Sequence, residues 1–396
     1  MSTRPAPVAA SIGRSPTVAL LDEVQRRRAL GLDVLNLSGG EPDFATPDHV
    51  VEPAVEALRD GFTHYTPSRG IPELREAIAA KLHTDNGIEA DPGTDIIVTP
   101  SAKHGMFIAL AGVIAPGDEV LVPSPAWVSY APMITLLGGR AVDVPLDPRS
   151  GFTLTAEQLT EAVTPRTRAV LVNTPNNPTG RMLTADEADA LARVADRHDL
   201  VVLADEIYEH IRYGGRTHRS LAARPDCRER TLTVNGFSKS YAMTGWRLGY
   251  VAGPTAVMRE VVKVQEHTVG CASSFVQRGA LAALGEASRP CVDDMVASYD
   301  ARRRFLVGAL NKIPGVTCDD PEGAFYALPD ISGLGLGSGQ ECAAWLIEHA
   351  GVVVTPGSAF GPSAERHVRL SFAAPLDILT TAVERITAAL RTEGAR

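Results

Sequence analysis

The chain has 396 residues, long enough for two compact domains or for one large domain with a smaller one appended. Of these residues, 44% are hydrophobic and 21% are charged, which is typical of a globular enzyme. Its formal net charge of -9 provides no basic surface for DNA or RNA, so we exclude nucleic acid as a partner. The five cysteines are scattered and form no Cys-x-x-Cys pair, so the sequence predicts neither a disulfide framework nor a metal site.

No segment has the pattern of a secretion signal or a membrane span. Residues 1–7 lack the apolar core of a signal peptide, and the apolar run 106–115 is too short to cross a bilayer. Together with cysteine usage that suits a reducing compartment, these features predict a cytoplasmic protein without a membrane partner.

In chain order, the first expected element is a helix at 17–30, followed by the apolar run 34–37. From about residue 44 to residue 285, short β-branched runs alternate with helical patterns. The expected strands are 95–99, 119–123, 169–173, 200–204, 231–235 and 248–252, and the expected helices include 72–83, 102–115, 185–198 and 254–265. This alternation predicts an α/β layer structure with a largely parallel sheet.

The remainder of the chain has a different pattern. A long helix at about 290–312 precedes short strands at 325–328, 352–355 and 367–372, and a final helix follows. We therefore assign residues 45–285 to a large domain. The segments 1–44 and 286–396 are expected to form a smaller α+β domain together.

Polar residues directly follow several of the predicted strands. Asp205 and Tyr208 follow 200–204, the run Asn173 to Gly180 follows 169–173, and Ser101 opens a helix after 95–99. Because active sites of open α/β sheets lie outside the carboxyl ends of the strands, we expect these groups to line one site. Taken singly, Asp205 is as well explained as a helix cap, and Asn176 to Gly180 as a turn.

Lys239 is the most informative residue of the chain. Only five of the 38 basic residues are lysines, so surface cations are nearly always arginines, whereas Lys239 lies among aromatic residues and is followed by Arg247. A desolvated lysine loses its proton readily and can attack a carbonyl, and an arginine binds anions. One cofactor needs both groups, namely pyridoxal 5'-phosphate with its aldehyde and phosphate.

The strand ends supply the other contacts that this cofactor requires. Asp205 would keep the ring nitrogen protonated, while Tyr208 and Asn177 would hydrogen-bond the ring oxygen. The phosphate would lie at the helix start, bound by the amides of Ser101, Ala102 and Lys103 with Ser238 and Arg247. Trp127, which alone is better explained as a core residue, would stack on the ring.

These motifs together resemble those of a class I aminotransferase of the fold-type I pyridoxal phosphate superfamily, close to the bacterial aspartate aminotransferase subgroup. The resemblance covers about residues 14–372. It is carried by Gly39 to Phe44, Tyr65 to Pro67, Asn176 to Gly180, Asp205 to Tyr208, Ser238-Lys239 with Arg247, and Val368 to Ser371.

The resemblance implies a mostly parallel, seven-stranded sheet flanked by helices, and a small domain that closes over the substrate. It also implies that Arg369 binds the substrate carboxylate, assisted by Gly40, Asn177 and Trp127. Tyr65 would contact the cofactor phosphate of the neighbouring subunit, which makes the active unit a homodimer.

The implied activity is transfer of an amino group from an L-amino acid to a 2-oxo acid such as 2-oxoglutarate in a ping-pong reaction, with aspartate or an aromatic amino acid as donor. Lys239, Asp205 and Tyr208 are the predicted catalytic residues. A pyridoxal phosphate-dependent lyase, cyclase or racemase is the alternative, and a cofactor-sensing regulator is a third.

Two departures from the family pattern concern the phosphate and the substrate. Ser101-Ala102 stands where relatives often have glycines before the phosphate-binding helix. In the segment that meets a second substrate carboxylate in relatives, only Arg14 is basic.

Overall fold

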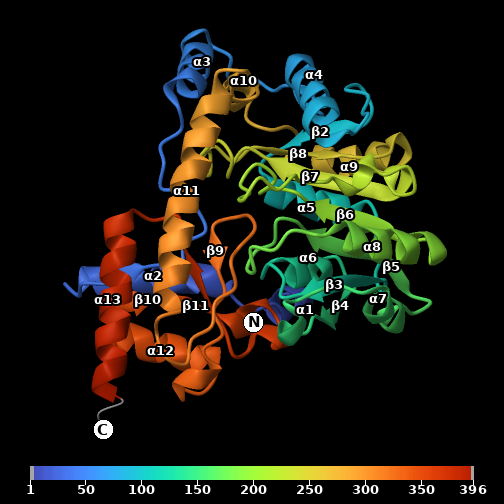
Figure 1. Cartoon of the computed structure of the whole chain (residues 1–396). Coiled ribbons are helices and arrows are strands. Elements are labelled where there is room, and N and C mark those ends of the chain that lie inside the picture. Colours follow the sequence, from blue (N-terminus) through green and yellow to red (C-terminus); the bar gives the residue numbers. More distant parts are fainter. Residues whose placement is uncertain (1–3, 394–396) are drawn as a thin grey trace.

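The computed structural model describes residues 4–393, and a seven-stranded sheet forms its centre (Figure 1). The strand order is β2 (Ile96–Thr99), β8 (Gly249–Ala252), β7 (Thr231–Gly236), β6 (Val201–Asp205), β5 (Thr167–Asn173), β3 (Glu119–Ser124) and β4 (Arg140–Pro145). Strand β8 runs antiparallel to β2 and β7, and the other six strands all run in one direction. This arrangement confirms the predicted α/β class with a mostly parallel sheet.

Strand β4 is the one strand of this sheet that the apolar pattern does not reveal. It lies at the edge, paired only with β3, and most of its side chains are at least partly exposed. An edge strand does not need the continuous apolar run that marks a strand buried on both faces. The sequence of β4 is therefore mixed in polarity.

Alternate residues of each central strand face helices on opposite sides of the sheet. Ile97 and Leu203 pack toward α5 (Ala102–Ala111), α6 (Tyr130–Leu136) and α9 (Thr255–Thr268). On the other side, Val202 packs with α7 (Ala156–Ala162) and α8 (Ala185–Arg197), while Ile96 packs with α4 (Pro72–Lys81) and α10 (Ser274–Ala283). Because successive side chains of a strand point to opposite faces, helices cover both faces of the sheet.

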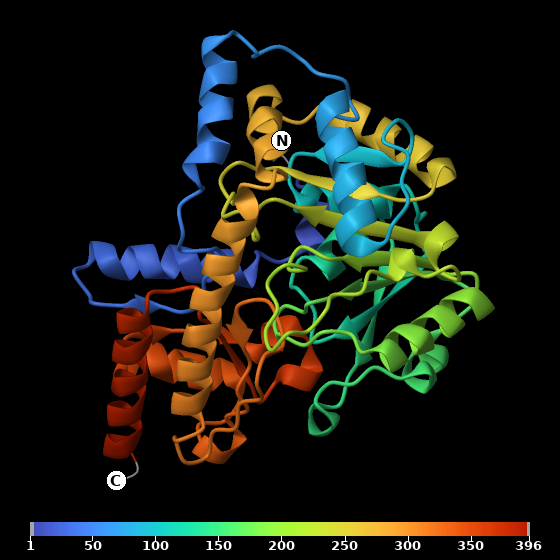
Figure 2. The ribbon, with the colours of Figure 1, turned by 45° about the horizontal axis from the view of Figure 1, so that its top comes forward.

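Elements from both ends of the chain form a second layer beside the large sheet (Figure 2). Strand β1 (Leu35–Asn36) pairs in parallel with β10 (Val352–Val353), and β11 (Thr355–Pro356), β12 (Val368–Ser371) and β9 (Tyr326–Ala327) form an antiparallel sheet. Around them lie α2 (Pro16–Ala29), α12 (Gly339–His349) and α13 (Leu376–Glu393). The N-terminal segment therefore packs with the C-terminal elements.

Helix α11 (Ser288–Leu310) runs from the region of α10 to these C-terminal elements (Figure 1). Two shorter helices, α1 (Pro7–Ser11) and α3 (Asp48–Arg59), lie near the start of the chain, and α3 packs along α10.

Helix α4 ends two residues earlier than predicted and continues as a π-helix over Leu82–Asn86. No helix among residues 4–393 is long and apolar enough to span a membrane.

Candidate functional site

The carboxyl ends of β5, β6 and β7 bring the predicted polar residues together at one edge of the sheet. Asp205 ends β6 beside Asn173, the last residue of β5, and the Asn173 side chain donates a hydrogen bond of 3.0 Å to the Asp205 carbonyl. Lys239 follows three residues after the end of β7. The expectation that strand ends converge on one site is met for these residues.

The Lys239 side chain is half-buried at this edge, and its amine donates a hydrogen bond to the Gly40 carbonyl. The amine lies 5.8 Å from the centre of the Phe325 ring and 6.0 Å from that of Tyr208. Burial lowers the pKa of Lys239 to about 8, and the charges of Arg247 and Arg369 contribute in the same direction. About a tenth of the amine is therefore unprotonated at pH 7, far more than for an ordinary lysine.

The Asp205 carboxylate is buried and held by two donors. The Tyr130 hydroxyl donates to Oδ2 at 2.6 Å, and the Ile207 amide donates to Oδ1 at 3.2 Å. Burial raises the pKa of Asp205 to about 6, while the hydrogen bond from Tyr130 opposes the increase. Asp205 is thus mostly ionised at neutral pH and has remaining lone pairs for a cationic partner.

The Tyr208 hydroxyl is paired with the Tyr326 hydroxyl at 2.9 Å, and both residues are buried. Burial raises the pKa of Tyr208 well above its usual value, so the phenol stays protonated. Tyr326 belongs to β9 of the smaller sheet. This contact joins the turn after β6 to the smaller sheet.

Arg369, on β12, is 2% exposed and lies at the base of the site. Its guanidinium donates to Asn177 Oδ1 at 2.8 Å and to the Ser38 carbonyl at 2.7 Å, and it stacks 4.4 Å from the centre of the Tyr326 ring. Its Nε is buried and has no hydrogen-bond partner among the residues that the structure describes. A buried guanidinium with an unused donor suits a carboxylate ligand.

Ser101, one of the two departures from glycine, is the residue that caps the start of α5. Ser101 has φ of 90°, a conformation that glycine adopts more readily, and its hydroxyl caps the helix by accepting from His104. Gly249 packs beneath this turn, and a Cβ there would lie 2.4 Å from the Ala102 nitrogen. The missing Cβ of Gly249 leaves room for the turn.

The two other predicted phosphate ligands differ in exposure. Ser238 is buried, whereas Arg247 is exposed and donates a hydrogen bond of 2.7 Å to the Thr244 carbonyl. Arg247 makes no ion pair with any residue in 4–393, so its charge is available to an anion.

Lys103 and Trp127 lie together near the start of α5. The Lys103 amine lies 5.0 Å from the centre of the Trp127 ring, and Trp127 packs edge-on against Tyr130 with ring centres 5.3 Å apart. Burial and then the nearby Arg247 charge lower the pKa of Lys103. Within the described chain, no carboxylate forms an ion pair with Lys103.

Two predicted residues lie apart from this cluster. Tyr65 is 95% exposed, so its side chain lacks the contacts within its own subunit that the other site residues have. Arg14 forms an exposed ion pair with Asp22 at 2.5 Å. The Arg14 charge is therefore already balanced within the N-terminal segment.

The chain is similar to known proteins in both sequence and structure. A model of the family described as aminotransferase class I and II matches residues 32–386. The chain belongs to this family. It is 49% identical to an aspartate aminotransferase of Musicola paradisiaca over 96% of this chain and 94% of that protein. It is 44% identical to aromatic-amino-acid aminotransferase 2 of Thermococcus litoralis, over 90% and 92% of the two chains.

Among solved structures, the aspartate aminotransferase of Thermus thermophilus with maleate superposes with a TM-score of 0.93 at 41% identity. The match covers 98% of this chain and 100% of that one. These findings confirm the predicted family, and with it a pyridoxal 5'-phosphate-dependent transaminase. They do not favour the alternative of a lyase, cyclase or racemase.

The residues of this aminotransferase fit the cofactor. Lys239 offers an amine of lowered pKa, and Asp205 offers a buried carboxylate with free lone pairs. The unpaired guanidinium of Arg247 and the N-terminus of α5 offer the donors that a phosphate needs. These three groups come from separate segments, which argues for one shared ligand.

Sequence reasoning missed Tyr130 and Tyr326. Tyr130 follows Trp127 by three residues, at the start of α6, so its position near a suspected aromatic platform was the available signal. Tyr326 is distant in sequence from Tyr208 and belongs to another sheet. No local pattern predicts such a contact.

The hydrogen bond from Tyr130 should tune cofactor binding. Tyr130→Phe removes a donor to the ionised form of Asp205, so the pKa of Asp205 should rise above its value of about 6. We expect the dissociation constant of pyridoxal 5'-phosphate, measured by titrating apoenzyme at pH 7, to increase roughly tenfold. The difference should shrink by about pH 8.5, where Asp205 ionises in both proteins. An equal loss at every pH would contradict this explanation.

Proposed function

We propose that this aminotransferase takes an acidic L-amino acid, with aspartate as the preferred donor, and passes its amino group to 2-oxoglutarate. The observation that carries this proposal is the presence of two separate cations at the site. Arg369 is buried beside Asn177, whereas Lys103 is exposed over Trp127. An amino acid with two carboxylates can satisfy both cations.

Lys239 is proposed to hold the cofactor and then to move a proton at the substrate Cα. The cofactor supplies an aldehyde carbon for the amino group and a ring that withdraws electrons. A general base works best when its pKa is near the operating pH, and burial brings the pKa of Lys239 to about 8. Asp205 would hold the ring nitrogen in its protonated form.

The substrate α-carboxylate is proposed to bind Arg369. The contacts with the Ser38 carbonyl and the Tyr326 ring fix the plane of the guanidinium, which favours two parallel hydrogen bonds to a carboxylate. Asn177, already bonded to Arg369, would contact the same carboxylate. The Gly40 amide would add a third donor.

The second carboxylate is proposed to bind Lys103. The amine lies beside the aromatic face against which the cofactor would stack, and its lowered pKa is consistent with a cation that lacks a carboxylate partner. The names of the relatives support an acidic donor, because several are aspartate aminotransferases and one solved structure contains maleate, a dicarboxylate.

We also propose that residues 45–285 form a cofactor-binding domain and that segments 1–44 and 286–396 form a small domain that closes over the substrate. The active unit is proposed to be a homodimer in the cytoplasm, with Tyr65 reaching the phosphate bound by the neighbouring subunit. The 95% exposure of Tyr65 supports this arrangement, since a partner could cover it. Cell fractionation tests the location.

Replacing Lys239 tests the central assignment. We expect Lys239→Ala to lose the visible absorption of the lysine-bound cofactor and to lower kcat by at least about 1000-fold. Lys239→Arg keeps the positive charge and serves as the matched control, and it should be equally inactive because its guanidinium stays protonated. Either variant with near-normal turnover would refute the role of Lys239.

Replacing Lys103 tests the donor. Lys103→Met keeps the length of the side chain and removes its charge, so kcat/KM for L-aspartate should fall roughly 10- to 100-fold. The value for L-alanine or L-phenylalanine should change little, because these donors lack a second carboxylate. A uniform loss across all donors would show that Lys103 does not select acidic substrates.

Subunit mixing tests the homodimer. Tyr65→Ala and Lys239→Ala should each have low activity alone. In a mixed dimer, one site would combine an intact Lys239 with an intact Tyr65 from the partner subunit. Each mixed dimer purified after co-expression should therefore have about half the activity of the wild-type dimer. No recovery in purified mixed dimers would place Tyr65 in its own subunit's site or outside it.

A further inference from the structure

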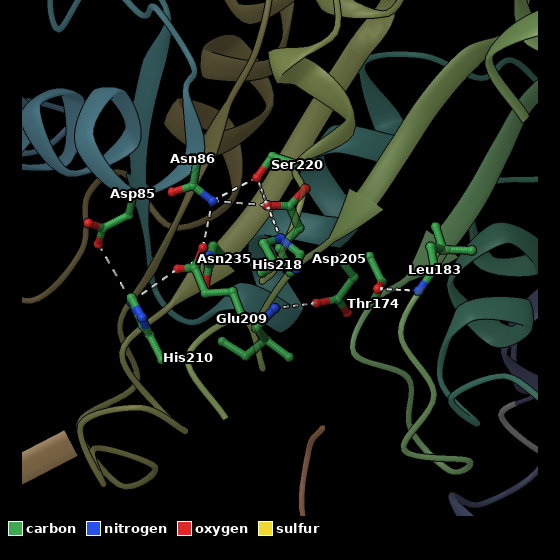
Figure 3. A network of polar contacts seen from close by, with 12 residues as sticks. Asp85, Asn86, Thr174, Leu183, Asp205, Glu209, His210, His218, Ser220 and Asn235 are labelled. Atoms are coloured by element: carbon green, nitrogen blue, oxygen red, sulfur yellow. Dashed lines mark hydrogen bonds and ion pairs between the residues drawn. The ribbon is translucent and has the colours of Figure 1, made fainter. Parts of the chain in front are cut away.

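A second group of buried charges lies behind the site, on the turn that follows β6 (Figure 3). Asp205 and Tyr208 contribute to the site, whereas Glu206 and Glu209 enter a separate polar network. Glu206 is fully buried and Glu209 is 4% exposed. Two buried carboxylates need positive partners, because an uncompensated buried charge is costly.

Glu206 has one titratable partner in direct contact, which is His218. The His218 Nε2 lies 3.0 Å from Glu206 Oε2, and the same oxygen accepts from Ser220 Oγ at 2.6 Å and from Asn86 Nδ2 at 3.3 Å. Glu206 Oε1 has no partner among residues 4–393. The neutral donors Ser220 and Asn86 orient the carboxylate, but only His218 can neutralise it.

Glu209 is balanced separately. Lys81 from α4 forms a buried ion pair with Glu209, and Asn86 and Asn235 donate to its two oxygens at 2.6 and 2.7 Å. His210 Nε2 lies 3.5 Å from Glu209 Oε1 and 4.0 Å from Asp85 Oδ2. Lys81 is therefore committed to Glu209, and Glu206 depends on His218.

A metal ion is a poor alternative for this cluster. Ligand atoms of Glu206, Glu209 and His218 lie within 4.8 Å of one another, close enough to hold a cation. However, the Asn86 amide donates to both carboxylates, and the Lys81 ammonium occupies Glu209. Proton donors directed at the carboxylate lone pairs would repel a metal ion.

We propose that His218 is a positioning residue for transamination, which acts through Glu206 to keep the adjacent Asp205 carboxylate ionised. Glu206 follows Asp205 directly in the chain, so its charge lies close to the Asp205 charge. The imidazolium of His218, in direct contact with Glu206, cancels the Glu206 charge. This inference rests on the proposed role of Asp205 toward the cofactor ring.

The electrostatics of the three groups agree with this arrangement. Burial and, to a smaller extent, the Glu206 charge raise the pKa of Asp205 to about 6. Burial alone would lower the pKa of His218, but the nearby carboxylates, Glu206 first, together outweigh burial and the net shift is upward, so the charged imidazolium is favoured. Glu209 also favours this charge, and Lys81 opposes it.

The decisive experiment compares His218→Gln with Glu206→Gln. The first variant leaves Glu206 without a cation, so Asp205 should ionise only at higher pH. The second removes the like charge, so Asp205 should ionise at lower pH. We expect the acid-side midpoint, both of cofactor affinity and of kcat, to move up by about one pH unit in His218→Gln and down in Glu206→Gln.

A purely structural role would not give shifts of opposite sign. The double variant carries neither charge and should return toward the wild-type midpoint. Circular dichroism and thermal unfolding identify any variant that is misfolded. Midpoints that move in the same direction, or that do not move, would overturn the inference, as would a stoichiometric metal that the purified enzyme loses in His218→Gln.

Asp205→Asn distinguishes this inference from the proposed function. If this variant bound pyridoxal 5'-phosphate as tightly as the wild type, the assigned role of Asp205 would fail. If it bound weakly while His218→Gln left the midpoint unchanged, only the role of His218 would fail.

Discussion

The central constraint on this structure is electrostatic: the Lys239 amine lies among charges of both signs, and burial together with these charges sets its pKa. Burial and the positive charges of Arg247 and Arg369 lower the pKa of Lys239, whereas Glu41 and Asp205 raise it. The result of about 8 is a balance between these effects. The pKa of Lys239 therefore depends on where the fold positions these charged side chains.

The end of β6 and the turn that follows it direct polar side chains to two different places. Asp205 and Tyr208 reach the site, and Glu206 and Glu209 reach the buried network behind it. A turn whose side chains are anchored on both sides has little freedom to move. The network thus fixes the position of Asp205 and Tyr208 in addition to balancing its own charges.

Much of the site could be predicted from the sequence because its residues follow apolar strands directly. Asp205 ends β6, Lys239 and Asn177 follow β7 and β5, and the rule that strand ends converge needs only local information. Contacts between distant segments could not be predicted in this way. The pairing of Tyr208 with Tyr326 depends on how the two sheets meet, and the exposed edge strand β4 lacks the apolar pattern on which the prediction relied.

The scarcity of lysine has a physical explanation in this fold. Three of the five lysines, Lys81, Lys103 and Lys239, lie in the site or in the network behind it. A guanidinium stays charged at all relevant pH values, so it suits positions that need a permanent charge, exposed as in the pair of Arg14 with Asp22 or buried as at Arg369. An ammonium is compact enough to be buried against Glu209, and it can also give up its proton, as we propose for Lys239. At Lys81 and Lys239, lysine therefore stands where size or proton transfer favours it over arginine, whereas Lys263 forms an exposed ion pair with Glu260.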